Sequence, residues 1–291
     1  MLQSNSGVEP VALVRNPARL FLMANTASRD KEEEAEVRGL VLAADYCDRA
    51  ALDAAFEQLD EPFRLYLACG NGPLQVAAEL NLIAAASATG KCEYICKLST
   101  CSAALEMAAG PYMAHLAVEA TLAAGDIPHS ILRPQMFMQM ISSPVVGIGD
   151  QLTDDSTLIY HPFADKGIPL IAAEDVARVA ATILQQPEMP VKPSADGLAP
   201  GETLELTGPT PVSYSDVTAS LSKQRSVPLE CRPRSFEEHA PAPPLAKFLE
   251  VLSTASTVTG EVERVTGKPA TTLDEFLVQH PDLFDNAGGA S

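Results

Sequence analysis

A histidine and a glutamate four residues apart, His115 and Glu119, are the residue types in this sequence best suited to moving or sharing a proton. At that spacing both side chains project from one face of a helix and can touch. A histidine held by a carboxylate could donate a hydrogen bond to a ribose hydroxyl or to a substrate carbonyl. A pair at the surface or cap of a helix would show the same spacing. We therefore take His115 as a candidate catalytic residue and keep that alternative open.

Two short polar segments follow predicted strands, at the edge where open α/β sheets bind their ligands. Gly70-Asn71-Gly72 follows an apolar run at residues 64–69, and Ser99-Thr100 follows another at residues 92–98. Both segments are candidates for contact with a bound ligand. Asn-Gly is also a common turn pair, so a plain turn over which a ligand merely passes is the alternative at the first of them.

Three cysteines lie close together, at Cys92, Cys96 and Cys101. Their spacing is not that of a zinc knuckle, and alternation along a strand would place Cys92 and Cys96 on one face. We predict no metal site here. The chain has six cysteines in 291 residues, which does not suggest a disulfide framework, and a reducing cytosol suits them better. The expected location is cytoplasmic.

Strand and helix patterns alternate along the first part of the chain, and this alternation is typical of a parallel sheet with helices on both faces. The fold class we expect is therefore α/β. Strands are predicted at residues 10–14, 38–44, 64–69, 92–98 and 129–132, and helices at residues 50–59, 74–89, 112–124 and 176–184.

From about residue 185 the pattern changes. Four prolines interrupt the chain between residues 187 and 200, a short strand is predicted at residues 204–206, and helices are predicted near residues 217–222 and 245–252. This composition favours a smaller mixed lobe. We therefore divide the chain into a sheet domain at residues 1–185 and a smaller lobe at residues 186–291.

The composition excludes several classes of partner. Hydrophobic residues make up 46% of the chain, as in globular proteins, and the formal net charge is −18. So acidic a surface repels nucleic acid and anionic lipid, although single basic residues can still hold one phosphate. No apolar run reaches the roughly 20 residues that span a bilayer, and no signal peptide is recognisable at the N-terminus. We expect a small-molecule ligand.

Several segments, in this order, together resemble the NmrA-like family, whose members are atypical short-chain dehydrogenase/reductases. The resemblance covers residues 8 to about 277. The segments that carry it are Val11-Ala12-Leu13-Val14-Arg15-Asn16-Pro17, Ala44-Asp45-Tyr46, Lys97-Leu98-Ser99-Thr100, His115 with Glu119, Ile131-Leu132-Arg133-Pro134, Phe137-Met138-Gln139, Ala173-Glu174-Asp175-Val176-Ala177, Leu206-Thr207-Gly208-Pro209, Val265-Thr266-Gly267-Lys268-Pro269 and Phe276.

The resemblance implies a Rossmann-like doubly wound parallel sheet, an NAD(P)-binding edge and a substrate cleft roofed by the smaller lobe. It places Arg15 beside the adenosine ribose, where a guanidinium can clamp a 2′-phosphate and favour NADP over NAD. It places Asp45 and Tyr46 near the adenine. The alternatives are a surface arginine, and a turn aspartate followed by a half-buried tyrosine.

The resemblance also implies the residues around the nicotinamide. Cys69, Gly70 and Asn71 would lie beneath its ribose, and Ser99 and Thr100 would join His115 as catalytic residues. Further cofactor contacts would come from His115 and Arg133. Phe137 and Met138 would form an apolar wall for a planar or hydrophobic substrate. A plain core segment is the alternative for these last two residues.

The sequence departs from the family pattern in two places. The Tyr-x-x-x-Lys pair of ordinary short-chain dehydrogenases is missing, and His115 stands where many relatives carry lysine. The glycine-rich G-x-x-G-x-x-G loop that holds the pyrophosphate is also missing, together with the strand before it, a unit of roughly 30 residues. We expect an N-terminally truncated sheet, in which the neighbours of that strand either leave an open edge or pair directly.

Three hypotheses about function follow. The first is an NADP-dependent oxidoreductase that reduces a small carbonyl, enone or quinone. The second is a non-catalytic regulator that senses NAD(P) or binds a protein partner. The third is a product that is inactive because the glycine loop is absent.

Overall fold

The structure is a computed structural model that describes residues 11–14, 40–107, 112–153, 156–186, 201–240, 242–254 and 257–284. Arg15, predicted to bind the cofactor, lies outside the described residues. The strands are β1 (Val11–Val14), β2 (Leu40–Ala43), β3 (Phe63–Leu67), β4 (Cys92–Leu98), β5 (His129–Pro134), β6 (Leu158–Tyr160), β7 (Glu202–Leu206) and β8 (Glu230–Arg232). The helices are α2 (Arg49–Phe56), α3 (Gln75–Ala88), α4 (Ser102–Glu106), α5 (Tyr112–Ala124), η1 (Met138–Ser142), α6 (Ala173–Leu184), α7 (Tyr214–Arg225), α8 (Phe236–His239), α9 (Pro243–Leu252), α10 (Glu261–Thr266), α11 (Leu273–Gln279) and η2 (Pro281–Phe284).

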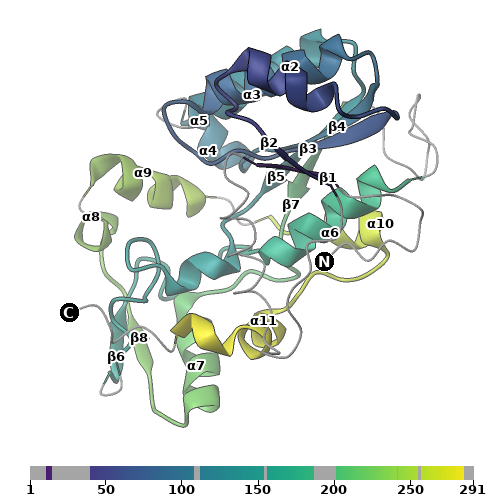
Figure 1. The fold of residues 1–291 in the computed structure, drawn as a ribbon. Coiled ribbons are helices and arrows are strands. Elements are labelled where there is room, and N and C mark those ends of the chain that lie inside the picture. Colours follow the sequence, from purple (N-terminus) through teal and green to yellow (C-terminus); the bar gives the residue numbers. More distant parts are fainter. Residues whose placement is uncertain are drawn as a thin grey trace.

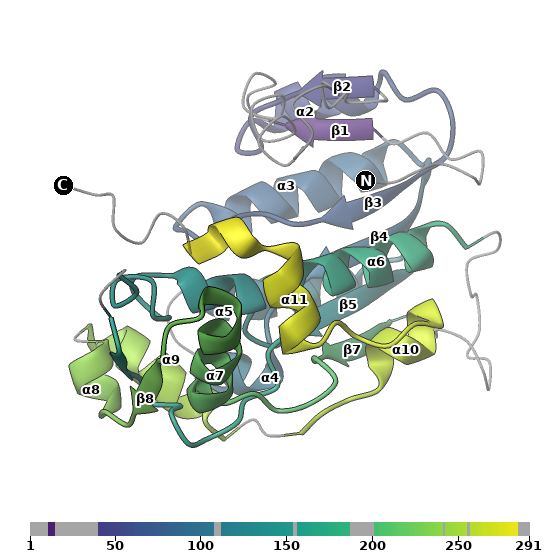
Figure 2. The same cartoon turned by 90° about the horizontal axis from the view of Figure 1, so that it is seen from below.

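The central sheet has four parallel strands in the order β3-β4-β5-β7. β1 and β2 form a separate parallel pair (Figure 2). β6 pairs with β8 (Figure 1). The predicted α/β class with a Rossmann-like parallel sheet is confirmed. Among the described strands β1 does not pair with β3, so the direct pairing that we considered for a truncated sheet is not formed.

Helices cover both faces of the sheet, as Figure 1 shows. Because side chains alternate along a strand, Ile95 and Ile131 face the layer of α2, α3 and α5. Tyr94, Cys96 and Leu132 face the opposite layer, where α6 and α10 pack. The sheet is therefore buried on both sides, as a parallel sheet requires. No helix in the described part of the chain is long and apolar enough to cross a membrane.

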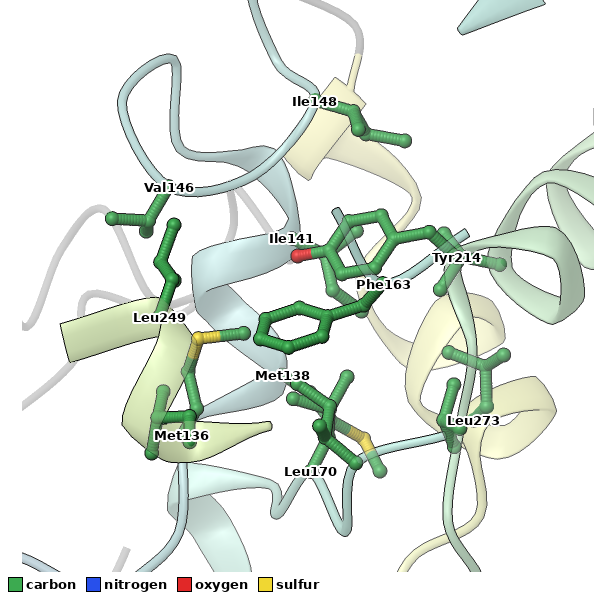
Figure 3. Packing of buried hydrophobic residues seen from close by; sticks show 14 of the residues in the cluster. Met136, Met138, Ile141, Val146, Ile148, Phe163, Leu170, Tyr214, Leu249 and Leu273 are labelled. Carbon is green, nitrogen blue, oxygen red and sulfur yellow. The ribbon is translucent and has the colours of Figure 1, made fainter. Parts of the chain in front are cut away.

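A second core lies beside the sheet, between segments that are distant in the sequence (Figure 3). Met138, Ile141 and Phe163 pack there against Tyr214 and Leu249. The division at residue 185 stays a prediction, and the described structure has contacts across it. This core joins residues from both sides of the boundary, and β7 returns to the central sheet beside β5.

The loop after η1 folds back tightly onto that helix, and Gly147 makes this approach possible. A Cβ atom at Gly147 would lie 2.2 Å from the carbonyl oxygen of Ile141 and 2.3 Å from that of Met140. Since backbone rather than a flexible side chain blocks the space, the substitution Gly147→Ala is expected to lower the free energy of unfolding by about 1–3 kcal/mol.

Chemical denaturation of Gly147→Ala against the wild type measures this loss. Gly260 provides the matched control, since it has φ −91° and nothing within 4 Å of an added Cβ. Gly260→Ala is expected to change stability by less than about 1 kcal/mol, because alanine is the poorer N-cap of α10 but also lowers the entropy of the unfolded chain. Equal stability of the two variants would contradict the close approach at residue 147.

Candidate functional site

Polar side chains gather at the carboxyl ends of three neighbouring strands of the central sheet. Asn71 lies in the loop after β3, Ser99 directly follows β4, and Arg133 lies near the end of β5. Helix α5 contributes His115 and Glu119 to the same groups of hydrogen-bonded residues. Parallel strands end on one edge of the sheet, which is why segments so far apart in the sequence meet here.

A buried lysine forms the base of this site. Lys97 has the same parity on β4 as Ile95, so it faces the layer of α3 and α5. Its ammonium nitrogen lies 3.1 Å from Oε1 of Glu79 on α3, and both side chains are 0% exposed. The Lys97 ammonium also donates to the backbone carbonyl of Leu98. Two charges are thus held inside the protein by each other.

His115 lies against this ion pair, and its neighbours determine which ring nitrogen carries the proton. Lys97 Nζ is 3.3 Å from Nδ1, and the Nε2 of Gln75 is 3.3 Å from each ring nitrogen. The Oδ1 of Asn71 is 3.2 Å from His115 Nε2. An ammonium can only donate and a carbonyl oxygen can only accept. Nδ1 of His115 is therefore the acceptor, and Nε2–H donates to Asn71.

The same surroundings keep His115 neutral. Burial, followed by the positive charge of Lys97, lowers the pKa of His115 to about 4, although the Glu119 carboxylate acts in the opposite direction. Burial also lowers the pKa of Lys97 and raises that of Glu79, while the attraction between the two opposes both shifts. At neutral pH His115 is an uncharged hydrogen-bond donor rather than an imidazolium acid.

A second group of polar residues surrounds Glu119. Its carboxylate accepts a hydrogen bond from the Ser99 hydroxyl at 2.5 Å and forms an ion pair with Arg133 at 2.5 Å. Arg133 also donates to the Ser102 hydroxyl at 2.8 Å and lies 3.6 Å from the Glu205 carboxylate. The expected contact between His115 and Glu119 is not formed. Both project from α5, but neighbouring elements supply stronger partners to each of them.

The residues predicted near the adenosine have local partners. The Asp45 carboxylate accepts a hydrogen bond from the backbone of Cys47 at 3.0 Å, as a turn aspartate does. The Tyr46 hydroxyl donates to the carbonyl of Leu13 at 2.6 Å and so ties β1 to the end of β2. Both residues remain at the carboxyl edge of β2, and their contact with a cofactor stays a prediction.

In contrast to these residues, the loop after β3 has no other described part of the protein packed against its two glycines. A Cβ atom at Gly70 or Gly72 would meet nothing within 4 Å. Helix α3 follows this loop, and its N-cap residue Leu74 supplies no side-chain hydrogen bond to the helix end. The half-buried Cys69 precedes the loop.

The remaining predicted residues lie away from the His115 network. The Thr100 side chain hydrogen-bonds to Cys101, and Phe137 is partly buried against the core that faces α6. Met138 is 0% exposed and belongs to the second core (Figure 3), so the core alternative describes it and we do not carry it into the site. Two shallow hollows beside β6 and β8, lined in part by Leu229, contain no residue of this network.

Sequence reasoning missed Lys97, Glu79 and Gln75. The available signal for Lys97 was its place beside the apolar run Tyr94-Ile95-Cys96 of a predicted strand. A strand that is covered on both faces keeps such a charge from water, so a partner of opposite charge is needed. Glu79 and Gln75 are four residues apart on α3 and both are buried. A glutamate and a glutamine at this spacing are common on exposed helix faces, so the sequence does not indicate that these two are buried.

No protein-family model matches the chain, and no curated protein sequence matches it. Solved structures do. An NADPH-dependent quinone oxidoreductase from Escherichia coli, in complex with NADPH, has a TM-score of 0.70 at 22% identity, covering 94% of this chain and 90% of that one. The triphenylmethane reductase of Citrobacter sp., in complex with NADP(H), has a TM-score of 0.69 at 21% identity, covering 92% and 89%. A nucleoside-diphosphate-sugar epimerase from Staphylococcus aureus has a TM-score of 0.65 at 14% identity, covering 92% and 99%. These likenesses show the Rossmann-like fold that the resemblance to NmrA-like proteins implied.

Proposed function

We propose that the protein is an NAD(P)H-dependent oxidoreductase that reduces a small carbonyl, enone or quinone in the cytoplasm, with NADPH as the preferred cofactor. The observation that carries this proposal is the neutral His115, whose Nε2–H points to Asn71 at the carboxyl edge of the parallel strands. When bound, the cofactor supplies the hydride. The protein supplies the hydrogen bond that polarises the acceptor.

A neutral imidazole suits this task. A substrate oxygen that replaces the Asn71 carbonyl oxygen would accept the Nε2–H of His115 without a charged acid having to be formed inside the protein. A hydrogen bond aimed at the oxygen that gains negative charge stabilises the transition state more than the ground state. Ser99 would contribute a hydroxyl if substrate or cofactor released it from Glu119, and Thr100 stays a weaker candidate beside it.

The residues present fit one half of a dinucleotide. The open backbone at Gly70 and Gly72, before a helix end without a side-chain cap, would receive a phosphate or ribose of the nicotinamide half. Cys69, Asn71 and His115 would flank it. The sequence has no G-x-x-G-x-x-G motif for the pyrophosphate. Arg133 is engaged by two carboxylates, and its contact with the cofactor would need that pairing to loosen.

Two of the similar structures support the choice of cofactor, because their proteins were crystallised with NADP(H) or NADPH and reduce triphenylmethane dyes or quinones. Phe137 stays a proposed contact for an apolar and planar acceptor: it follows β5 and is only partly buried, although it packs on the core that faces α6.

Titration of the protein with NADPH, followed by cofactor fluorescence, tests binding directly, and loss of NADPH absorbance with a panel of quinones, enones and aldehydes tests turnover. His115→Phe is expected to lower kcat by about 100-fold, because a positioned donor of this kind contributes roughly 10²-fold or more, and to weaken NADPH binding by a smaller factor. His115→Gln is expected to retain more activity than His115→Phe, since an amide is also a neutral donor.

His280 is the matched control. It caps α11 and pairs with Glu174, away from the network, so His280→Gln should leave kcat unchanged. Equal activity of His115→Phe and the wild type would exclude the proposed role of His115. Failure to bind NADPH at millimolar concentration would exclude the oxidoreductase altogether.

The second candidate is a non-catalytic protein that senses NAD(P) or binds a protein partner. The commitment of Ser99, Glu119 and Arg133 to one another favours it, because hydroxyl and guanidinium groups that are already paired contribute to stability rather than to chemistry. NADPH binding without turnover of any acceptor would select this alternative.

A further inference from the structure

We propose that the buried Lys97–Glu79 pair is a positioning device that fixes His115 in the Nε2–H tautomer and aims this hydrogen at the loop after β3. The catalytic meaning of this inference rests on the proposed function. The tautomer itself is a property of the folded protein and can be measured without any substrate.

Lys97 has hydrogen-bond acceptors around its ammonium group. An ammonium group has three N–H donors and no acceptor. Three groups surround it, namely Oε1 of Glu79, the backbone carbonyl of Leu98 and Nδ1 of His115. Leu98 and His115 accept hydrogen bonds from the ammonium, whereas both carboxylate oxygens of Glu79 are buried without one and attract the lysine by charge. Lys97 cannot turn away from His115 without losing one of its two hydrogen-bond acceptors. A buried donor without an acceptor is costly in a site that excludes water.

The opposite tautomer of His115 is excluded by the same contacts. A hydrogen on Nδ1 would point at the Lys97 ammonium 3.3 Å away and set two donors against each other. It would also set Nε2 as an acceptor against the Oδ1 of Asn71, which has no hydrogen to give, and leave the Gln75 amide 3.3 Å away as the donor for it. Glu79 acts one step further back, because it holds the lysine in its charged form and in this position.

The elements packed against His115 each contribute a charged or titratable group near it. Lys97 comes from β4 and Glu79 from α3, while Glu119 comes from α5 itself and is neutralised by Arg133 of β5. Cys69, beside the loop after β3, contributes a thiol near Lys97. Of these groups only Lys97 lies within hydrogen-bond distance of an imidazole nitrogen, and its positive charge also disfavours a proton at Nδ1.

The test compares wild type with the double variant Glu79→Gln/Lys97→Met. Removing both charges avoids a lone buried charge, and glutamine and methionine have nearly the volumes of the residues they replace, so this variant should fold. Nitrogen-15 labelled histidine and long-range proton–nitrogen correlation spectra report the tautomer and the pKa of each ring, and the His115 signals are assigned by their disappearance in His115→Gln.

Wild type is expected to show a pure Nε2–H tautomer for His115. In the double variant we expect a mixture of tautomers and a higher pKa of His115, since the nearby positive charge is gone. The single variant Glu79→Gln removes the carboxylate that keeps the lysine charged, so it should shift the tautomer in the same direction, by less than the double variant. A wild-type Nδ1–H tautomer, or a double variant identical to wild type in tautomer and pKa, would overturn the proposal.

The ratio of kcat to KM effects distinguishes a positioning role from a purely structural one. The double variant is expected to lose about tenfold or more in kcat, with KM for NADPH unchanged, because only the direction of the donor is affected. Lys247→Met, which removes one partner of an exposed ion pair with Glu250, should leave kcat unchanged. If the wild type shows no turnover, the spectra still decide the tautomer, so the two proposals fail separately.

Discussion

The single substitution Lys97→Met is expected to lower the free energy of unfolding by about 3–5 kcal/mol, the cost typical of removing one partner of a buried ion pair. Glu79 would be left in a site where both side chains are 0% exposed. The burial that already raises its pKa would then act without the compensating charge of Lys97. Urea denaturation at neutral pH measures the difference from wild type.

Two comparisons separate this effect from ordinary loss of packing. The double variant Glu79→Gln/Lys97→Met is expected to recover most of the lost stability, because no isolated charge remains. Lys247→Met breaks an ion pair whose side chains are 59% and 54% exposed, and should cost less than about 1 kcal/mol. A double variant as unstable as the single one would show that packing around Lys97, and not its charge, stabilises this region.

The free energy of unfolding is also expected to fall steeply as the pH is lowered from about 6.5 towards about 3. These limits are the pKa of an ordinary histidine and the lowered pKa of the buried histidines. Burial lowers the pKa of His161 to about 3 and that of His115 to about 4. His161 is 0% exposed, stacks on Tyr214 at 3.4 Å between ring centres, and has both ring nitrogens engaged by backbone groups of Val146 and Phe163.

The sign follows from which state binds protons more readily. A histidine whose folded pKa is lowered takes up a proton more easily in the unfolded chain. Its contribution to stability is therefore complete above the unfolded pKa of about 6.5 and is lost as the pH falls towards the folded value. Each such residue adds up to about 1.4 kcal/mol of lost stability per pH unit within that interval. Glu79, whose pKa is raised, acts in the opposite direction.

Unfolding free energies measured at several pH values between about 4 and about 6 test this for His161. In His161→Gln the slope against pH should be smaller by close to the value for one proton, because glutamine does not titrate. Glutamine keeps a donor and an acceptor for Val146 and Phe163. Exposed carboxylates with lowered pKa, such as Glu238, contribute equally to both proteins. An unchanged slope would mean that His161 is protonated in the folded protein at these pH values.

Much of the fold follows from local sequence patterns. The strand predicted at residues 92–98 and the helix predicted at residues 112–124 have those bounds in the structure, because a short apolar run between turn residues and an apolar helix ended by glycine are strong local signals. Helix α7 is longer than predicted. It begins at Tyr214, since Ser213 and Asp216 form a capping box, and ends at Arg225.

The site was less accessible to such reasoning, because its contacts join different elements. Helical spacing brings His115 and Glu119 to one side of α5, but it contains no information on the groups that other elements bring nearby. Arg133 from β5 and Lys97 from β4 take these two residues as separate partners. Likewise, the hydrophobicity of Met138 fits a substrate wall and a core equally well, and only tertiary packing places it in the core.

The separation of the β1–β2 pair from the four-stranded sheet has a consequence for cooperativity. No backbone ladder joins the two sheets in the described residues, and they are connected through side chains such as Leu13 and Leu42 beneath α2 and α3. Regions joined by side chains alone can open as units of their own, at a lower free energy than global unfolding. Asp45 and Tyr46 would then belong to a subdomain that exchanges its amide hydrogens sooner than the strands around His115. A ligand that contacts both regions would make them unfold together.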